Sequence, residues 1–339
     1  MKVLPAEDVR AAARECGFAL VGLAPAEPLD PKPLEDWLAQ GYAAGLLAMR
    51  RRPRERLDPR AVVPGAQTVL VLGIPYGKGE PDEAGAATIA RYARGRDYHY
   101  AHRDRMRRLR GCLRQMAPSL RSYACVDSGA AMEKAWAERA GLGFIGKHGV
   151  VVSRSHGSWF TLSLMVLDAA VDAYDSPHPH LCGDCRKCLD ACPTGAFPSP
   201  GVVDARRCLS YHTVENHGEI PAEVRAGLGP RVFGCDACQE VCPFNRVDLP
   251  PGDPRQAPRP ISRLAAAELA ALDEAHFAEL ASGTPVRRIG YHGLRRNACL
   301  ALGATLDHES RALLVCLTND PSSLVAEAAA WALRELGTD

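Results

Sequence analysis

Two runs of cysteine carry the clearest chemistry in the sequence. In each run, two or three residues separate one cysteine from the next, and the run ends in Cys-Pro. The residues are Cys182, Cys185, Cys188, Cys192 and Pro193 in the first run and Cys235, Cys238, Cys242 and Pro243 in the second, with Cys208 between the runs. In runs of this spacing, three cysteines hold one 4Fe-4S cluster and the fourth reaches across to another. Eight thiolates therefore predict two 4Fe-4S clusters.

The crossing pattern of bacterial ferredoxins, whose first run has this spacing, divides the eight cysteines into two sets. One cluster would be held by Cys182, Cys185, Cys188 and Cys242, and the other by Cys192, Cys208, Cys235 and Cys238. Zinc is the alternative, but zinc sites usually pair two C-x2-C units and need neither a third cysteine nor a repeated Cys-Pro ending. We expect iron–sulfur clusters, close enough to pass electrons.

The other five cysteines stand singly within apolar helical or strand patterns. Because free cysteine behaves as a small hydrophobic residue, all five are expected to be buried packing residues. They are Cys16, Cys112, Cys125, Cys299 and Cys316.

The composition is that of a globular protein. The chain has 339 residues, a net charge of +1, 47% hydrophobic and 24% charged residues, which excludes disordered, collagen-like and coiled-coil chains. It has no apolar run of membrane-spanning length and no apolar signal segment at its start, so we expect a cytoplasmic protein with no membrane partner. It also lacks a P-loop and a G-x-G-x-x-G after a strand, so neither an ATPase nor a Rossmann nucleotide site is indicated.

Strand and helix patterns alternate through residues 1–174, which favours an α/β domain. Apolar runs predict strands, and helical spacing of apolar residues predicts helices. The expected strands are 19–23, 68–74 and 122–126, the expected helices are 8–16, 103–116 and 130–140, and 149–153 with 159–167 should form a closing β-hairpin.

Two further segments follow this domain. Residues 175–249 are rich in Pro, Gly, His and Cys and should form a small ferredoxin-like module with two 4Fe-4S clusters. After a stiff proline-rich linker that begins at Pro250, residues 250–339 are helical. Within them, 294–306 and 324–336 share an apolar spacing that suggests a HEAT-like domain; an ordinary helical cap fits the pattern equally well.

Three arginine clusters interrupt the near-neutral charge. Residues 91–121 hold ten arginines, residues 50–60 hold six, and Arg287, Arg288, Arg295 and Arg296 form a third cluster with no acid among them. A guanidinium donates two parallel hydrogen bonds to a phosphate, so the clusters suggest a nucleic-acid partner. Solvated helix faces are the alternative for any single cluster.

Five further segments, together with both cysteine runs, resemble one family. The chain is similar to the epoxyqueuosine reductases over nearly its whole length. The segments are RYARGRDYH at 91–99, VDSG at 126–129, EKAWAERAGLGFIGK at 133–147, RRIG at 287–290 and LRRNA at 294–298.

The resemblance implies reduction of epoxyqueuosine to queuosine at the wobble position of tRNA, a two-electron, two-proton reaction that releases water. It also implies that the two clusters relay electrons from an external donor to a cobalamin in the α/β domain. Asp127 corresponds to the family's proton donor, and a carboxylic acid in that role needs a pKa raised by burial. The alternative is that Asp127 caps the helix expected from residue 130.

Family position also implies contacts to cobalamin and tRNA. The expected cobalamin-binding residues are Arg56, Tyr98, His99, Asp127, Lys147, Val151, Ser158, Leu162, Ser210 and Asp236. The expected tRNA-binding residues are Arg287, Arg288, Arg295, Arg296 and Asn297, which would contact the backbone or bases of the anticodon stem-loop. A monomer is the simplest expectation for an enzyme that admits a whole tRNA.

Two other functions remain open from the sequence. A reductive dehalogenase combines cobalamin with two 4Fe-4S clusters but acts on small organohalides and usually carries an export signal. An electron-transfer protein would use the clusters without a reaction of its own. Neither explains the segment around Asp127 as well as a reductase does.

Overall fold

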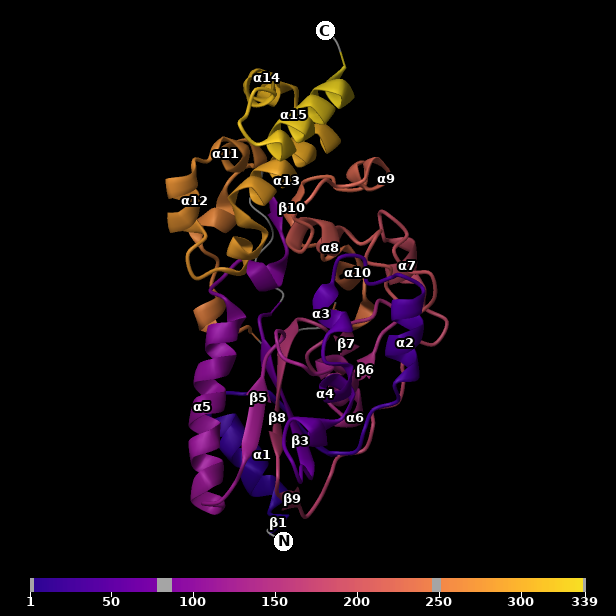
Figure 1. Ribbon diagram of the computed structural model, residues 1–339, viewed down its shortest axis with the longest axis vertical. Helices are drawn as coiled ribbons and strands as arrows, with labels where there is room; N and C mark the ends of the chain where they lie inside the picture. Colours follow the sequence, from indigo (N-terminus) through magenta and orange to yellow (C-terminus); the bar gives the residue numbers. More distant parts are fainter. Residues whose placement is uncertain (1–2, 78–86, 246–250, 338–339) are drawn as a thin grey trace.

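The computed structural model describes residues 3–77, 87–245 and 251–337. Figure 1 shows a sheet with flanking helices at the N-terminal end of the molecule and a group of helices at the C-terminal end. The cysteine-rich segment lies beside them. Within the described residues, no helix is long and apolar enough to cross a membrane.

A four-stranded sheet forms the centre of the first segment. Its strands are β2 (Leu20–Pro25), β3 (Thr68–Pro75), β5 (Ser122–Cys125) and β8 (Phe160–Leu167), in the order β2-β3-β8-β5. All neighbouring strands of this sheet are antiparallel, so the domain mixes helices and strands as expected, and its parallel pairing is confined to short strands outside this sheet. β5 lies at an edge of the sheet.

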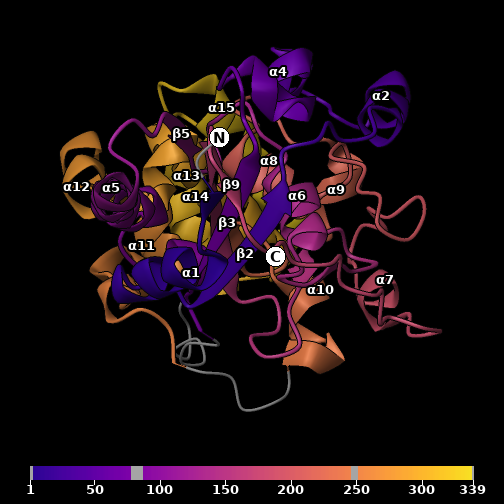
Figure 2. The same cartoon turned by 90° about the horizontal axis from the view of Figure 1, so that it is seen from below.

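Side chains of β3 alternate between two apolar layers, as the two-residue period of a strand requires. Leu70, Leu72 and Ile74 pack with the helices α1 (Ala6–Glu15) and α5 (Tyr98–Met116). Val69 and Val71 pack on the opposite face with α6 (Glu133–Arg139). Figure 2 shows α1 and α5 on one side of the sheet and α6 on the other. The sheet is therefore covered on both faces, which explains its nearly continuous apolar strands.

The predicted hairpin is wrong in its pairing. β8 pairs with β3 and β5, whereas β7 (Val151–Val152) pairs with β6 (Phe144–Ile145). Between β7 and β8 only an isolated bridge joins Ser153 and Gly157. Because most of β8 is buried, it gains more by pairing on both edges inside the sheet than by pairing with a two-residue strand.

Most of the remaining elements are short, and α13 and α15 of the tail are the exceptions. Near the start are β1 (Val3–Leu4), α2 (Lys32–Ala39), α3 (Leu47–Arg50), α4 (Pro53–Leu57), β4 (Thr88–Ile89) and β9 (Ala170–Val171). The cysteine-rich segment contains α7 (Lys187–Asp190), α8 (Leu209–Val214), α9 (Ala222–Arg225), β10 (Arg231–Phe233) and α10 (Ala237–Glu240). The tail contains α11 (Ala266–Ala271), α12 (Glu274–Leu280), α13 (Gly290–Ala304), α14 (Arg311–Leu317) and α15 (Ser323–Leu336). The 3-10 helices are η1 (Pro59–Ala61), η2 (Arg91–Ala93), η3 (Pro243–Asn245), η4 (Pro254–Gln256), η5 (Pro260–Arg263), η6 (Pro285–Ile289) and η7 (His308–Ser310).

One hydrophobic core joins the cysteine-rich segment to the tail. It contains Leu209, Val232 and Phe233 from the segment and Leu294 and Leu300 from α13. β10 also pairs with β4, so the first segment takes part in the same assembly. In the tail, α13 packs against α15 as the shared apolar spacing indicates. The HEAT-like character of the tail stays a prediction.

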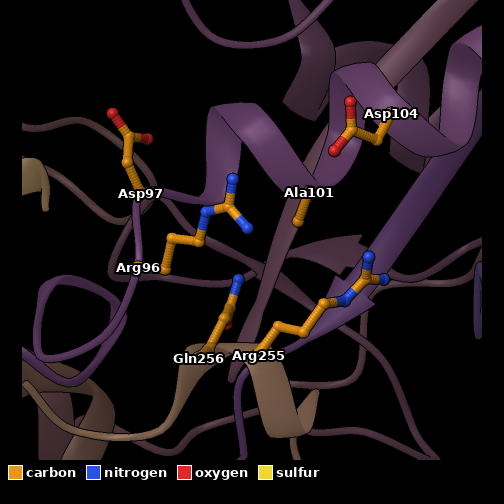
Figure 3. Close-up of a pocket in the computed structure, with 6 residues that line it drawn as sticks. All are labelled: Arg96, Asp97, Ala101, Asp104, Arg255 and Gln256. Atoms are coloured by element: carbon orange, nitrogen blue, oxygen red, sulfur yellow. The ribbon is translucent and has the colours of Figure 1, made fainter. Parts of the chain in front are cut away.

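The proline-rich linker is docked on the first segment. Pro250 lies outside the described residues, but Arg105 of α5 forms a buried ion pair of 2.6 Å with Asp253. The start of α5 and η4 enclose a cavity of about 10 Å³, lined by residues such as Arg96 and Gln256, which is too small for an organic ligand (Figure 3). The linker therefore fixes the tail to α5 and does not act as a free spacer.

The single cysteines are mostly interior, as expected. Cys16, Cys125 and Cys299 are buried and Cys112 is partly buried. Cys316 is exposed, so the expectation of a packing role is wrong at this position. It lies on the outer face of the short helix α14, whose Leu314 and Leu317 face the core.

The structure contradicts the predicted tRNA contacts of Arg295, Arg296 and Asn297. The side chains of Arg296 and Asn297 are 1% and 0% exposed, and Arg295 is also buried. Asn297 donates to the carbonyls of Thr213 (3.0 Å) and Val232 (2.8 Å). These residues therefore join α13 to the cysteine-rich segment. Positive charge alone predicted a surface role, but buried guanidinium and amide groups can be satisfied by carbonyls.

The guanidinium groups of Arg295 and Arg296 both have hydrogen-bond partners inside the protein. Arg296 donates to the carbonyls of His212 and Asn216 and to the Asn297 side chain. Burial lowers the pKa of Arg296 to about 10. Arg295 forms a buried ion pair of 2.6 Å with Asp320. The segment 295–297 is a polar network inside the shared core.

Replacing Asn297 with alanine should destabilise the protein. The change leaves the buried carbonyls of Thr213 and Val232 without donors, which predicts a loss of about 3 kcal/mol in the free energy of unfolding. Denaturant unfolding measures the loss. The exposed Asn319 gives the matched control, since Asn319→Ala should change stability by less than about 0.5 kcal/mol. Equal effects of both substitutions would contradict the assignment of Asn297 to the core.

Candidate functional site

The structure brings the eight motif thiols together in two groups of four. In the first group, burial raises the pKa of Cys188 to about 11, and repulsion from the other three thiols adds to the rise. The same neighbours act on Cys242, which comes from the second cysteine run. The first group consists of Cys182, Cys185, Cys188 and Cys242.

The second group combines the lone cysteine with both runs. Burial raises the pKa of Cys238 well above its ordinary value, and repulsion from Cys235, Cys208 and Cys192 contributes. Cys208 also accepts backbone hydrogen bonds from Tyr211 and Ser210 at the start of α8. The second group consists of Cys192, Cys208, Cys235 and Cys238.

Each group fits the donor set of a four-iron cluster, which needs four thiolates. In residues 3–77, 87–245 and 251–337, no three His, Cys, Asp or Glu side chains converge on a single ion. Each group combines cysteines of both runs, as in the crossing pattern of two neighbouring clusters.

Asp127 lies in the loop that follows the edge strand β5. Its backbone adopts a left-handed conformation (φ 52°), which is uncommon for a residue other than glycine. Its side chain is 47% exposed, so the burial expected for a proton donor is not seen. The capping alternative is also wrong, because α6 begins at Glu133 and its N-cap is Met132. The loop instead presents the carboxyl group toward neighbouring polar side chains.

Three side chains surround the Asp127 carboxyl group. Arg288 Nη1 donates to Asp127 Oδ2 at 3.2 Å, and His99 Nε2 lies 3.8 Å from the same oxygen. Tyr98 forms a hydrogen bond with the carboxyl group; burial, with the charge of Asp127, raises the pKa of Tyr98 above its ordinary range. The site therefore combines α5, the β5 loop and η6, which are distant in the sequence.

The partners of Asp127 are themselves held in place. His99 Nδ1 lies 2.7 Å from Asp97 Oδ1, and the backbone N–H of His99 donates to the same carboxylate, which caps α5. Burial acts to raise the pKa of Asp97, but the hydrogen bonds from His99 outweigh it and the pKa is lowered. Arg288 Nε lies 2.8 Å from Glu215. These contacts fix the imidazole and the guanidinium on either side of Asp127.

Two further residues support the Asp127 loop: Glu133, which the sequence analysis did not name as a site residue, and Arg56, which it assigned to cobalamin. The carboxyl group of the partly buried Glu133 accepts a hydrogen bond from the backbone N–H of Asp127. Burial raises the pKa of Glu133 to about 8, and the charge of Asp127 adds to the rise. Arg56 donates to the carbonyls of Ala131 (3.3 Å) and Gly129 (3.5 Å). The only sequence feature that could have pointed to Glu133 is its place in segment 133–147, which resembles the epoxyqueuosine reductases.

Four of the expected cobalamin-binding side chains have partners inside the protein. Arg56 is occupied by backbone carbonyls, and Val151 packs in the core of the sheet. Ser158 bonds with Gln239 and Asn245 of the cysteine-rich segment. Asp236 accepts from the backbone N–H of Arg91, and burial raises the pKa of Asp236 to about 6. Their contact with cobalamin stays a prediction.

The other expected cobalamin contacts are more accessible. Lys147, Leu162 and Ser210 are partly exposed, and Lys147 Nζ donates to Gly183 near the first cysteine run. Two buried ring nitrogens, Trp159 Nε1 and His148 Nε2, have no hydrogen-bond partner among the described residues. Each follows a predicted contact in the sequence, and the amide side chains of cobalamin are suitable acceptors for such N–H groups. The residues present therefore fit this cofactor.

Two protein-family models match this chain, one over the cysteine-rich segment and one over part of the first segment. A model described as a 4Fe-4S double cluster binding domain matches residues 181–245, which contain both thiol groups. The fold and the thiols thus define a double-cluster iron–sulfur protein. A second model, described as epoxyqueuosine reductase QueG, DUF1730, matches residues 56–128, which end at the Asp127 loop.

Relatives and solved structures extend the similarity over almost the whole chain. An epoxyqueuosine reductase of Gloeobacter violaceus is 40% identical over 91% of this chain and 98% of its own length. The epoxyqueuosine reductase of Escherichia coli is 35% identical over 95% of this chain and 86% of its own length. A crystal structure of selenomethionine-labelled epoxyqueuosine reductase superposes with a TM-score of 0.91 at 30% identity, covering 98% of this chain and 90% of that one. The chain belongs to the epoxyqueuosine reductase family and is an oxidoreductase.

Two further solved structures bear on the site. One family member was crystallised with an epoxyqueuosine-modified stem-loop of tRNA-Tyr; it has a TM-score of 0.90, 30% identity and covers 98% of this chain. The structure of the Bacillus subtilis enzyme has its catalytic aspartate loop swung out of the active site, with a TM-score of 0.87.

Replacing Glu133 with glutamine should remove a pH dependence of stability. The folded-state pKa of about 8 lies above the ordinary value of 4.5, so the unfolded chain releases this proton first and wild-type stability falls as pH rises between these values. Glu133→Gln lacks this loss. Its free energy of unfolding, relative to wild type, should rise by up to a few kcal/mol from pH 5 to pH 8.

Denaturant unfolding across this pH range measures the difference. Glu335→Gln, at an exposed site in α15, provides the control and should follow the wild-type curve. Parallel curves for wild type and Glu133→Gln would show that Glu133 is not protonated in the folded protein.

Proposed function

We propose that this chain reduces epoxyqueuosine to queuosine at the wobble position of tRNA. In this reaction both C–O bonds of the epoxide break, a C=C bond forms, and two electrons and two protons convert the oxygen to water. Family membership supports the reaction, and the relative bound to a modified tRNA stem-loop supports the substrate. The observation that carries the proposal is the polar cluster at Asp127, within a chain that also brings together two thiol groups.

Asp127 donates a proton to the oxygen that leaves the epoxide. Its half-exposed carboxyl group is accessible to a substrate, and Tyr98 and Arg288 hold it from two sides. His99 lies between Asp97 and Asp127, so it can orient the carboxyl group and return a proton to it. Glu133 and Arg56 hold the backbone on which Asp127 stands.

Each thiol group would hold one 4Fe-4S cluster, and the two clusters would supply electrons from an external donor. The mixed composition of each group, with cysteines from both runs, supports two neighbouring clusters. Cobalamin, when bound, supplies a low-potential cobalt that delivers electrons to the epoxide. Trp159, His148, Lys147, Leu162 and Ser210 are the residues that would hold it, because they are accessible or have unpaired N–H groups.

The HEAT-like tail contributes Arg287 and Arg288 to the tRNA contact. Both are exposed on η6, and Arg288 reaches Asp127. A phosphate of the RNA can accept from these guanidinium groups, which would bring the backbone of the substrate to the edge of the site. The chain acts as a monomer in this proposal, because its own three segments complete the site.

Replacing Asp127 with asparagine should abolish turnover without emptying the cofactor sites. Asparagine keeps the shape and tolerates the left-handed backbone but cannot donate the acid proton, so the single-turnover rate should fall by at least about 100-fold. Conversion of epoxyqueuosine to queuosine in tRNA, followed by mass spectrometry of the nucleosides, measures the rate.

Iron and cobalamin contents provide the control and should equal those of wild type. If Asp127→Asn loses its cofactors, its rate does not report on proton donation. The rate of Asp127→Glu, which retains a carboxylic acid, then tests the role of the acid. Wild-type rates in Asp127→Asn with full cofactor content would remove Asp127 from the mechanism.

A further inference from the structure

Two cysteines outside the thiol groups lie against each other between α1 and α5. Cys16 follows the last residue of α1, and Cys112 lies in the second half of α5. Their thiols are within hydrogen-bonding reach of each other. Cys16 is 4% exposed, whereas Cys112 is partly exposed and packs against the same hydrophobic core. None of the functions assigned above uses this pair of thiols.

The path of the turn after α1 explains why the two thiols meet. Gly17 lies against α5, since a Cβ added at Gly17 would come within 3.0 Å of Arg105 Nε. Arg108 Nη2 donates to the Cys16 carbonyl at 2.9 Å. Arg105, Arg108 and Cys112 are three and four residues apart, so they share one face of the helix. The turn runs along this face, and Cys112 is the next position beyond the arginine that holds Cys16.

The packing of the two helices keeps this contact in place. Figure 1 shows α1 beside the lower half of α5, and both helices cover the same face of the sheet. The apolar layer that they share includes Val9 and Ala13 of α1 and Leu109 and Leu113 of α5. The two cysteines therefore belong to elements that are held together by a buried core and not by the thiols themselves.

The two thiols differ in their access to small molecules. Cys112 is partly exposed, whereas Cys16 is enclosed by the core. Burial raises the pKa of Cys16, and the neighbouring Cys112 thiol adds to the rise. Because the thiolate is the reacting form, an external reagent should react first at Cys112. An accessible cysteine beside a second one that resolves its adduct is the usual arrangement of a redox-sensing site.

We propose that Cys16 and Cys112 form a reversible disulfide by exchange with a small-molecule disulfide. Cys112 Sγ attacks one sulfur of the small disulfide, whose S–S bond breaks as a mixed disulfide forms. Cys16 Sγ then attacks Cys112 Sγ, which breaks the mixed disulfide and forms the bond between the two cysteines. Two small thiols leave with the two thiol protons. The cysteines lose two electrons, and the small disulfide gains them.

The disulfide would act as a clamp between α1 and the helix that carries part of the site. α5 begins with Tyr98 and His99, which contact Asp127, and the bond would tie its second half to α1. The bond closes a loop of roughly 100 residues, and cross-links that close long loops restrict the unfolded chain most. The oxidised protein should therefore resist unfolding better. This inference does not depend on the proposed function.

Peptide mapping of the holoprotein tests whether the bond forms. The protein is incubated with oxidised glutathione, its free thiols are blocked with iodoacetamide, and it is digested with trypsin without reduction. Peptide 15–50, which contains Cys16, should be joined to peptide 111–114, which contains Cys112. Dithiothreitol should separate them. Cys316, exposed on α14, is the internal control and should carry glutathione without a cross-link.

Single substitutions test the order of the two steps. Cys16→Ser should keep glutathione on Cys112, because the resolving thiol is missing. Cys112→Ser should leave Cys16 unmodified, because Cys16 is buried. Cys316→Ser should form the cross-link as wild type does. Wild-type protein that retains glutathione on Cys112, or whose Cys112 stays free while Cys316 is modified, would overturn the inference.

Thermal unfolding tests the clamp. Oxidation should raise the unfolding midpoint of wild type by about 5 °C and should not raise that of Cys16→Ser or Cys112→Ser. Iron content, measured before and after oxidation, shows whether cluster loss contributes. Equal shifts in wild type and both variants, or a cross-link without any shift, would refute the clamp. If Cys16→Ser does not fold, the peptide map of wild type and the partly exposed Cys112→Ser still decide the outcome.

Discussion

The insertion of Arg296 and Asn297 into the cysteine-rich segment is the constraint on which the site depends. Their hydrogen bonds to the carbonyls of His212, Thr213 and Val232 fix α13 against α8 and β10. η6 ends where α13 begins, so the same bonds fix its arginines. Arg288 can therefore meet Asp127 and Glu215 at once. The buried hydrogen bonds of Arg296 and Asn297 therefore position the Arg288 guanidinium beside the Asp127 carboxyl group, and the surface charge of the tail does not.

The sequence predicted best what depends on local spacing. The thiol groups follow from the intervals between cysteines, and the strands 68–74 and 122–126 follow from their apolar residues. It predicted poorly what depends on distant partners. The pairing of β8 is decided by two strands elsewhere in the chain, and the burial of Arg295 is decided by Ala270 and Asp320. Residue type alone shows a charge but not the groups that surround it.

The acid of the site illustrates the same limit. A proton donor is expected to be buried, yet Asp127 is half exposed, and the carboxyl group with the raised pKa is that of the partly buried Glu133. The two residues are six apart in the sequence and on opposite sides of one loop. The backbone N–H of Asp127 joins them. Position in the motif singled out Asp127 as the proposed proton donor, but only the folded loop shows that the carboxyl group of Glu133 accepts from its backbone N–H.

The core shared by the cysteine-rich segment and the tail has a consequence for biosynthesis. Leu209, Val232 and Phe233 are made well before α13 and α15, which cover them. While the chain is still on the ribosome, the segment that receives the clusters is complete in sequence but has an open apolar side. Stable closure waits for the last helices. The apolar side of the cysteine-rich segment is therefore covered only after α13 and α15 have been made.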